Sequence, residues 1–106
     1  MKLSLIIPCY NEEAAAPIFH REATEVLRGM DAEYEMLFIN DGSQDQTLAV
    51  LRSLAAQDPH VTYLSFSRNF GKEAAMYAGF CNAKGDYVAV MDADMQDPPS
   101  LLPQML

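Results

Sequence analysis

The chain has 106 residues, half of them hydrophobic, and a formal net charge of −8. This length suits one globular domain with a modest core. Seven Lys and Arg residues against fifteen Asp and Glu, with no basic cluster, argue against nucleic-acid binding. A phosphorylated ligand would need a divalent cation or backbone N–H groups to offset its charge.

The cysteine and histidine usage is that of a reduced protein without a structural metal. Cys9 and Cys81 lie far apart in apolar surroundings, so we expect two buried free thiols in a reducing, cytosolic compartment. His20 and His60 are isolated in the sequence and lack metal-ligand spacing, which predicts two surface residues. No apolar run reaches the roughly 18 residues of a membrane span or has the form of a signal peptide, so we expect a soluble segment.

Strand and helix patterns alternate along the first half of the chain. The apolar run Leu3–Pro8 predicts a strand that ends at its proline, and apolar residues at helical spacing over 18–30 predict a helix. Met36–Ile39 repeats the strand pattern and runs into the turn-forming residues 40–43.

The pattern continues through a second helix and a third strand. Ser43 and Gln46 have the spacing of a capping box, and the helix that follows, with Leu48, Leu51, Leu54 and Ala55 on one side, should stop before Asp58. Val61–Phe66 predicts the third strand.

The last predicted helix and strand follow a glycine turn at residues 69–71. Lys72–Ala83 is small or apolar nearly all round, which predicts a largely buried helix closed by a glycine C-cap at Lys84-Gly85. Tyr87–Met91 predicts the fourth strand.

Continuous apolar strands joined by helices predict a doubly wound α/β fold, with a mainly parallel sheet and helices on both faces. We expect the strand order 3-2-1-4, which reverses direction between strands one and four. Ligands of such sheets bind at the carboxyl ends of the strands beside that reversal. Three polar segments should meet there: Pro8–Glu12, Asn40–Asp45 and Asp92–Asp97.

Asp92, Asp94 and Gln96 alternate along the segment after the last strand. Because side chains alternate with period two in extended chain, all three can lie on one side and reach one ion. Mg²⁺ and Mn²⁺ take oxygen ligands, commonly carboxylates together with substrate phosphates. A solvated acidic turn is the alternative, since a bare Asp-x-Asp often occurs by chance, but the expected position favours a metal site. Asp97, followed by two prolines, predicts a helix N-cap.

Other polar residues near this edge have two interpretations each. Asp41 can accept hydrogen bonds from a ribose or base, or it can form an Asx turn. Tyr10 can stack on a base and Glu12 can lie near a sugar, or both can be ordinary capping and surface residues. Arg68 and Lys72 flank a glycine turn before a helix and suit anionic groups or salt bridges, although a P-loop is excluded because its upstream glycine and following Ser or Thr are absent.

Four stretches together resemble, in order and spacing, the GT-A inverting glycosyltransferases of the polyprenyl-phosphate sugar transferase type, which includes dolichol-phosphate mannose synthase and bacterial undecaprenyl-phosphate glucosyltransferases. The four stretches are IIPCYNEE, FINDGSQD, SRNFGKEAA and MDADMQDPP. They span nearly the whole chain, so the resemblance is more specific than any one motif.

The resemblance implies a set of site residues. Nucleotide-sugar contacts fall on Pro8, Tyr10, Glu12, Asp41, Asp92 and Asp94, with the backbone around Ile39 and Ala93. The metal and diphosphate positions fall on Asp92, Asp94 and Gln96, with Mg²⁺ or Mn²⁺ as the ion. Asn40 departs from the aspartate that relatives often carry, so base preference does not carry over.

The implied reaction transfers a sugar from a nucleoside diphosphate donor to a polyprenyl phosphate, with inversion. A phosphate acceptor is already anionic near neutral pH, so we nominate no catalytic base. Residues 1–106 would be the donor-binding half of the domain, truncated at its C-terminus. The full-length protein is then expected on the cytoplasmic side of a membrane, where it could form a homo-oligomer.

The sequence leaves three alternatives and disfavours a fourth. Another GT-A transferase would act on a saccharide acceptor. A receiver-like signalling module is also small, acidic and doubly wound, but it needs paired acids after the first strand, where this chain has residues 8–11, PCYN. A non-catalytic interaction domain would bind no nucleotide. A dinucleotide-binding domain is disfavoured because no GxGxxG follows the first strand.

Overall fold

The computed structural model describes residues 2–30, 32–94 and 99–105. Four strands alternate with helices, as the sequence predicts. The elements are β1 Lys2–Cys9, α1 Ala15–Arg28, β2 Glu33–Asn40, α2 Thr47–Gln57, β3 Val61–Ser65, α3 Lys72–Asn82, β4 Tyr87–Val90, the 3-10 turn η1 Pro99–Leu101 and α4 Leu102–Met105. Among the described residues, no helix is long and apolar enough to cross a bilayer.

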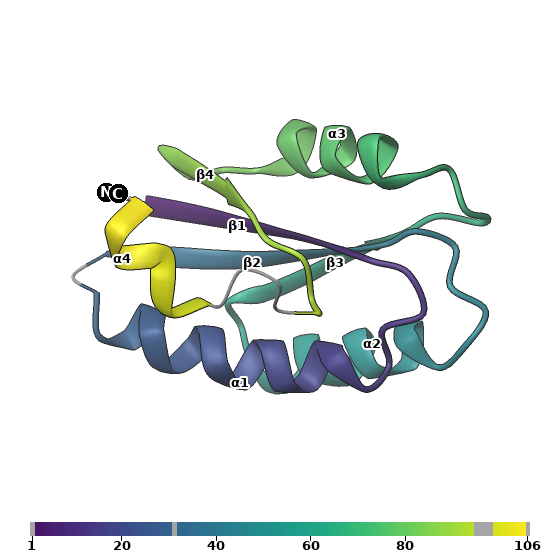
Figure 1. Ribbon diagram of the computed structural model, residues 1–106, viewed down its shortest axis with the longest axis horizontal. Coiled ribbons are helices and arrows are strands. Elements are labelled where there is room, and N and C mark those ends of the chain that lie inside the picture. Colours follow the sequence, from purple (N-terminus) through teal and green to yellow (C-terminus); the bar gives the residue numbers. More distant parts are fainter. Residues whose placement is uncertain (1, 31, 95–98, 106) are drawn as a thin grey trace.

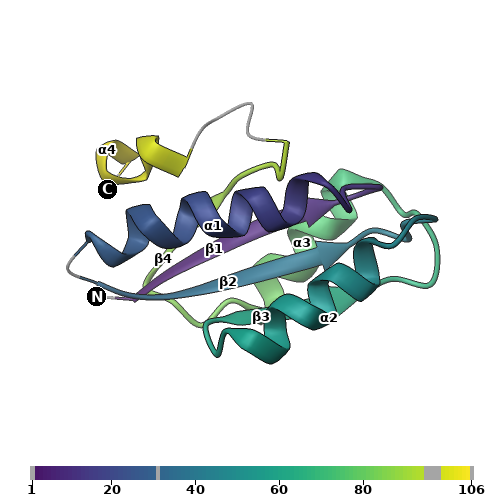
Figure 2. The same cartoon turned by 90° about the horizontal axis from the view of Figure 1, so that it is seen from below.

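The strands form one parallel sheet in the order β3-β2-β1-β4, which confirms the predicted fold and strand order. In the register, Leu5 of β1 lies opposite Met36 of β2 and Ala89 of β4. Figures 1 and 2 show α1 and α2 side by side on one face of the sheet and α3 on the other. The reversal of direction therefore lies between β1 and β4, as expected.

The alternation of side chains along β1 separates the two halves of the core. Leu5 and its alternate neighbours pack in one cluster with Phe19 of α1, whereas Ile6 packs on the other face with Ala75 of α3. α3 lies very close to the sheet, since a Cβ added at Gly79 would come within 2.5 Å of the Ile6 side chain. Apolar side chains of the helices thus pack against both faces of the sheet.

The prediction that α3 is largely buried is wrong. Only Ala75 and Gly79 are buried in this helix, while Tyr77 is 72% and Phe80 50% exposed. One side of the helix meets the sheet, and among the described residues nothing covers its opposite side. Cys81 is consequently exposed rather than buried, whereas Cys9 is buried as predicted.

Two predicted helix caps are replaced by other contacts. α3 ends at a C-cap on Ala83, and Gly85 instead packs against β1, where a Cβ would lie 2.6 Å from Ser4 Oγ. α2 begins at Thr47, later than a capping box at Ser43 requires, and Asp45 Oδ1 accepts the Thr47 backbone N–H at 2.9 Å. The N-cap residue Gln46 makes no side-chain capping hydrogen bond, so Asp45, one residue before it, supplies the oxygen at this helix start.

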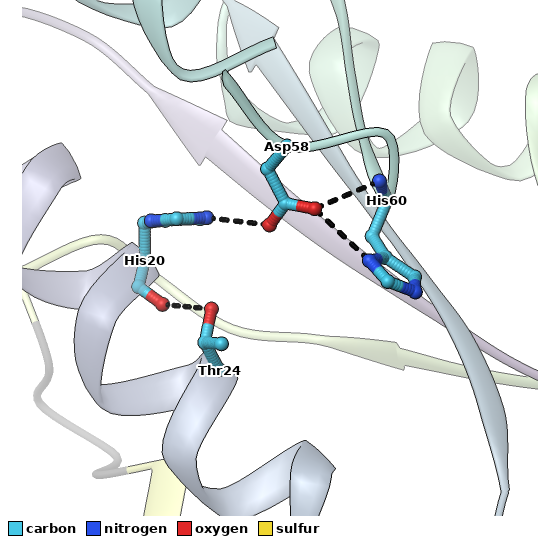
Figure 3. Close-up of polar contacts among 4 residues, drawn as sticks. All are labelled: His20, Thr24, Asp58 and His60. Carbon is cyan, nitrogen blue, oxygen red and sulfur yellow. Dashed lines mark hydrogen bonds and ion pairs between the residues drawn. The ribbon is translucent and has the colours of Figure 1, made fainter.

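The two histidines, predicted to be isolated surface residues, share a carboxylate. Figure 3 shows both imidazoles pointing to Asp58: His20 Nε2 lies 2.8 Å from Oδ2 and His60 Nδ1 lies 2.9 Å from Oδ1. The His60 backbone N–H also donates to Oδ1 at 2.9 Å. His60 is exposed, as predicted, but His20 is partly buried.

Candidate functional site

The carboxyl edge of the sheet joins the segments after β1 and β2. The Asp41 N–H donates to the Cys9 carbonyl at 2.8 Å, and the Glu12 N–H donates to Thr47 Oγ1 at 2.9 Å. Asn11, in a left-handed conformation with φ 53°, donates its N–H to Ser43 Oγ at 2.9 Å. This network holds the two segments as one wall of the site.

A cavity of about 430 Å³ lies at this edge. It is lined by Pro8, Cys9, Tyr10, Glu12, Asp41, Asn69, Gly71, Lys72 and Asp92. Residues from all three predicted segments therefore contribute to one cavity. A larger hollow, of about 640 Å³, lies around the amino ends of β1 and β2 and contains none of the four motifs, so we assign the site to the carboxyl edge.

Asp41 lines the cavity and is only 4% exposed. Its carboxylate accepts the Phe70 N–H at 2.8 Å, the Gly71 N–H at 3.0 Å and the Asn69 side-chain amide at 3.2 Å. The alternative Asx turn at Asp41 is replaced by a contact of Asn40, whose Oδ1 accepts the N–H of Ser43, three residues on, at 3.2 Å. The carboxylate thus fixes the loop before α3, and its contact with a nucleotide stays a prediction.

Lys72 also lines the cavity. Its Nζ lies 2.9 Å from both carboxylate oxygens of Asp92. Of the two salt-bridge interpretations at this turn, the one at Lys72 is confirmed. Arg68 instead places its guanidinium 4.4 Å from the ring centroid of Phe70. Arg68 is not among the described residues that line the cavity.

Several carboxylates gather here, and their negative charges act on Glu12. The pKa of Glu12 is raised, first by burial and then by the negative charges of Asp94, Asp92 and Asp45. Burial, followed by the charges of Glu12 and Asp92, raises the pKa of the Cys9 thiol far above its ordinary value. Cys9 is therefore a protonated residue of the cavity wall. The negative charge of the surrounding carboxylates favours binding of a cation over binding of an anion.

The remaining predicted site residues differ in exposure, and some lie outside the described residues. The side chains of Ile39 and Ala93 are fully buried, so only their backbone can face a ligand. Asp94 is exposed next to Asp92. Gln96 and Asp97 lie outside the described residues, and so do their predicted roles as metal ligand and helix cap.

Sequence analysis placed Cys9 in a segment expected at the site but gave it no role there, and it missed Asn69 and Gly71 as cavity residues. Cys9 directly follows Pro8 at the end of β1, so its position at the strand end was an available signal. Asn69 reaches the cavity because of its hydrogen bonds to Asp41, a residue 28 positions away, and no local pattern indicates that pairing.

The donor set fits a divalent cation that shares its coordination with a ligand. Within residues 2–30, 32–94 and 99–105, no three acidic, imidazole or thiol side chains converge as in an all-protein metal cage. Asp92 already holds a cationic group between its two oxygens, and Asp94 adds a second carboxylate to the local negative charge. Mg²⁺ and Mn²⁺ commonly need one or two carboxylates and complete their shell with phosphate oxygens and water.

Comparison with known proteins identifies relatives of this chain. Residues 4–106 match the family model described as glycosyl transferase family 2. The chain is 46% identical over 106 residues to the bactoprenol glucosyl transferase of Shigella phage SfV, covering 100% of this chain and 34% of that protein. It is 39% identical to the undecaprenyl-phosphate 4-deoxy-4-formamido-L-arabinose transferase of Sodalis glossinidius, covering 99% of this chain and 32% of that protein.

A solved structure shares the fold. The mannosyltransferase PcManGT from Pyrobaculum calidifontis, solved in complex with GDP-Man and Mn²⁺, superposes with a TM-score of 0.69 at 26% identity. The match covers 87% of this chain and 27% of that one. This chain thus spans about a third of the length of its curated relatives.

Proposed function

This chain belongs to glycosyl transferase family 2, and on that premise we propose that residues 1–106 form the donor-binding part of a sugar transferase. The donor is a nucleoside diphosphate sugar and the acceptor is a polyprenyl phosphate. The observation that carries the proposal is the cavity at the carboxyl edge, which Asp92 of the MDADMQD motif and Pro8, Tyr10 and Glu12 of the first motif line together.

Each side of the cavity has a proposed task. Tyr10, 44% exposed, offers a face on which a base can stack, and Asp41, which directly follows β2, would accept a hydrogen bond from the ribose. Asp92 and Asp94 would hold a Mg²⁺ or Mn²⁺ ion with Gln96. The ion, when bound, supplies Lewis-acid stabilisation of the negative charge that develops on the leaving diphosphate.

The acceptor class follows from the relatives, two of which are named as bactoprenol and undecaprenyl-phosphate sugar transferases. An anionic phosphate oxygen is a competent nucleophile near neutral pH, so the reaction needs no strong general base in this part of the chain. Attack from the face opposite the leaving diphosphate would invert the anomeric carbon. Because the acceptor is a membrane lipid, we place the complete protein at a membrane, on its cytoplasmic side.

Calorimetric titration with UDP and GDP, each with and without Mn²⁺, tests the donor site. We expect binding that requires the ion, and no binding of either nucleotide with Mn²⁺ present would refute the proposal. Incubation of the full-length protein with radiolabelled nucleotide sugars tests the acceptor. Label should enter a polyprenyl phosphate in detergent and not a free oligosaccharide, and the reverse result would identify a saccharide acceptor.

A further inference from the structure

The ion pair between Lys72 and Asp92 lies in the cavity and has no task in the proposed function. Lys72 is the first residue of α3, and the loop before it is fixed by the three hydrogen bonds to Asp41. Its ammonium lies 2.9 Å from each oxygen of Asp92, the carboxylate assigned to the divalent cation. A protein ammonium therefore already pairs with the carboxylate that would bind the ion.

In this ion pair, the Lys72 ammonium can be displaced from Asp92. The Lys72 side chain is 57% exposed and that of Asp92 is 29% exposed, so water screens their attraction. Pairs of this kind contribute at most about 1 kcal/mol. A divalent ion that also binds Asp94 and phosphate oxygens can displace the ammonium, because it gains several charged ligands at once.

A displaced Lys72 has an anion partner within reach. Its four-carbon side chain is flexible, and it projects from the N-terminus of an 11-residue helix, where the helix dipole favours negative charge. The space beside it is open, since a Cβ added at Gly71 would meet no atom within 4 Å. A diphosphate bound to an ion at Asp92 would lie between the ion and this helix end.

We propose that Lys72 is an exchangeable resident cation of the donor site. It pairs with Asp92 while no divalent ion is bound, and it donates to a phosphate oxygen of the nucleoside diphosphate once the ion takes Asp92. This proposal rests on the proposed donor site. It predicts that one side chain opposes ion binding and supports nucleotide binding, which a purely structural salt bridge would not do.

The test compares Lys72→Met with Lys84→Met. Both remove one positive charge and keep an unbranched side chain, but Lys84 is exposed at the opposite edge of the sheet and does not line the cavity. We measure Mn²⁺ binding without nucleotide by the loss of the free-ion electron paramagnetic resonance signal. UDP and GDP binding at saturating Mn²⁺ is measured by calorimetry.

We expect Lys72→Met to bind Mn²⁺ alone about threefold more tightly than the unchanged protein, because the competing ammonium is gone. At saturating Mn²⁺ it should bind the nucleotide about tenfold more weakly, because a charge-assisted hydrogen bond is lost. Lys84→Met should change neither constant. The opposite signs of the two effects are the signature of exchange.

Each other outcome has a distinct meaning. Unchanged or weaker Mn²⁺ binding by Lys72→Met would overturn the competition, and unchanged nucleotide binding would overturn the handover to phosphate. If the unchanged protein binds Mn²⁺ but neither nucleotide, the proposed function fails, while the Mn²⁺ measurement still decides whether Lys72 competes for Asp92. Circular dichroism of both variants excludes loss of folding as the cause.

Discussion

Asp41 is the residue on which the geometry of the site depends most. Replacing it with alanine removes the acceptor for the Phe70 and Gly71 N–H groups, which the carboxylate receives at 2.8 and 3.0 Å. We expect the loop before α3 to open locally, at a cost of about 1–3 kcal/mol in the free energy of unfolding. Amide hydrogen exchange of Phe70 and Gly71, followed by nuclear magnetic resonance, should accelerate.

A matched control separates this effect from the loss of an acidic charge. Asp86 also accepts a backbone N–H, from Lys2 at 3.0 Å, but it is exposed at the other edge of the sheet. Asp86→Ala should leave the exchange of Phe70 and Gly71 unchanged. If Asp41→Ala also leaves these two amides protected, the loop is held by other contacts and the positioning role of Asp41 is wrong.

At the scale of elements, Asp58 links α1, α2 and β3. The residue caps the end of α2, bonds His20 on α1 and bonds His60 just before β3, where His60 stacks on Tyr34 with ring centroids 4.2 Å apart. When the histidines are neutral, His20 must hold its proton on Nε2 and His60 on Nδ1 to donate to the carboxylate. One side chain thus orients two helices and a strand.

This link makes stability depend on pH in a defined direction. Burial raises the pKa of Asp58, but the hydrogen bonds from His20 and His60 outweigh burial and hold the pKa below its usual value. A carboxyl with a lowered folded-state pKa stabilises the fold above its unfolded pKa, about 3.9, and this contribution is lost as the pH falls through the folded-state pKa. Asp58→Asn should therefore cost about 1 kcal/mol at pH 7 and less below about pH 4.

Urea unfolding of Asp58→Asn and the unchanged protein at pH 3 and pH 7 measures that difference. Glu22→Gln, which neutralises an exposed carboxylate on α1, serves as the charge control and should show no comparable pH dependence. A cost for Asp58→Asn that is equal at both pH values would mean that packing, and not the carboxylate, carries the contribution of Asp58.

The elements also show how much of the fold can be predicted from the sequence. Continuous apolar strands predict the parallel sheet and its order correctly, because burial on both faces and right-handed crossovers leave few arrangements. The exposure of α3 could not be predicted, since an all-round small and apolar composition does not say which neighbours exist. The Lys72–Asp92 pair joins residues 20 positions apart, and such pairs follow from the fold and not from local spacing.

At the scale of the whole molecule, repulsion between negative charges opposes folding. The chain carries a net charge of −8, and Glu12, Asp92 and Asp94 gather at one edge of the sheet. A divalent ion bound there should stabilise the folded protein by about 2.7 kcal/mol at a concentration of one hundred times its Kd. Simple screening by salt relieves the repulsion of all exposed charges and is not specific to this edge.

Thermal unfolding in Mn²⁺ against NaCl of equal ionic strength separates the two effects. We expect a higher Tm in Mn²⁺, an increment that Asp92→Asn abolishes and Asp86→Asn preserves, because only the first substitution removes a proposed ion ligand. Lys72→Met should enlarge the increment, since the ammonium no longer competes for Asp92. Equal Tm values in Mn²⁺ and NaCl would mean that the acidic edge is only a region of repulsion, and the metal site would have to be abandoned.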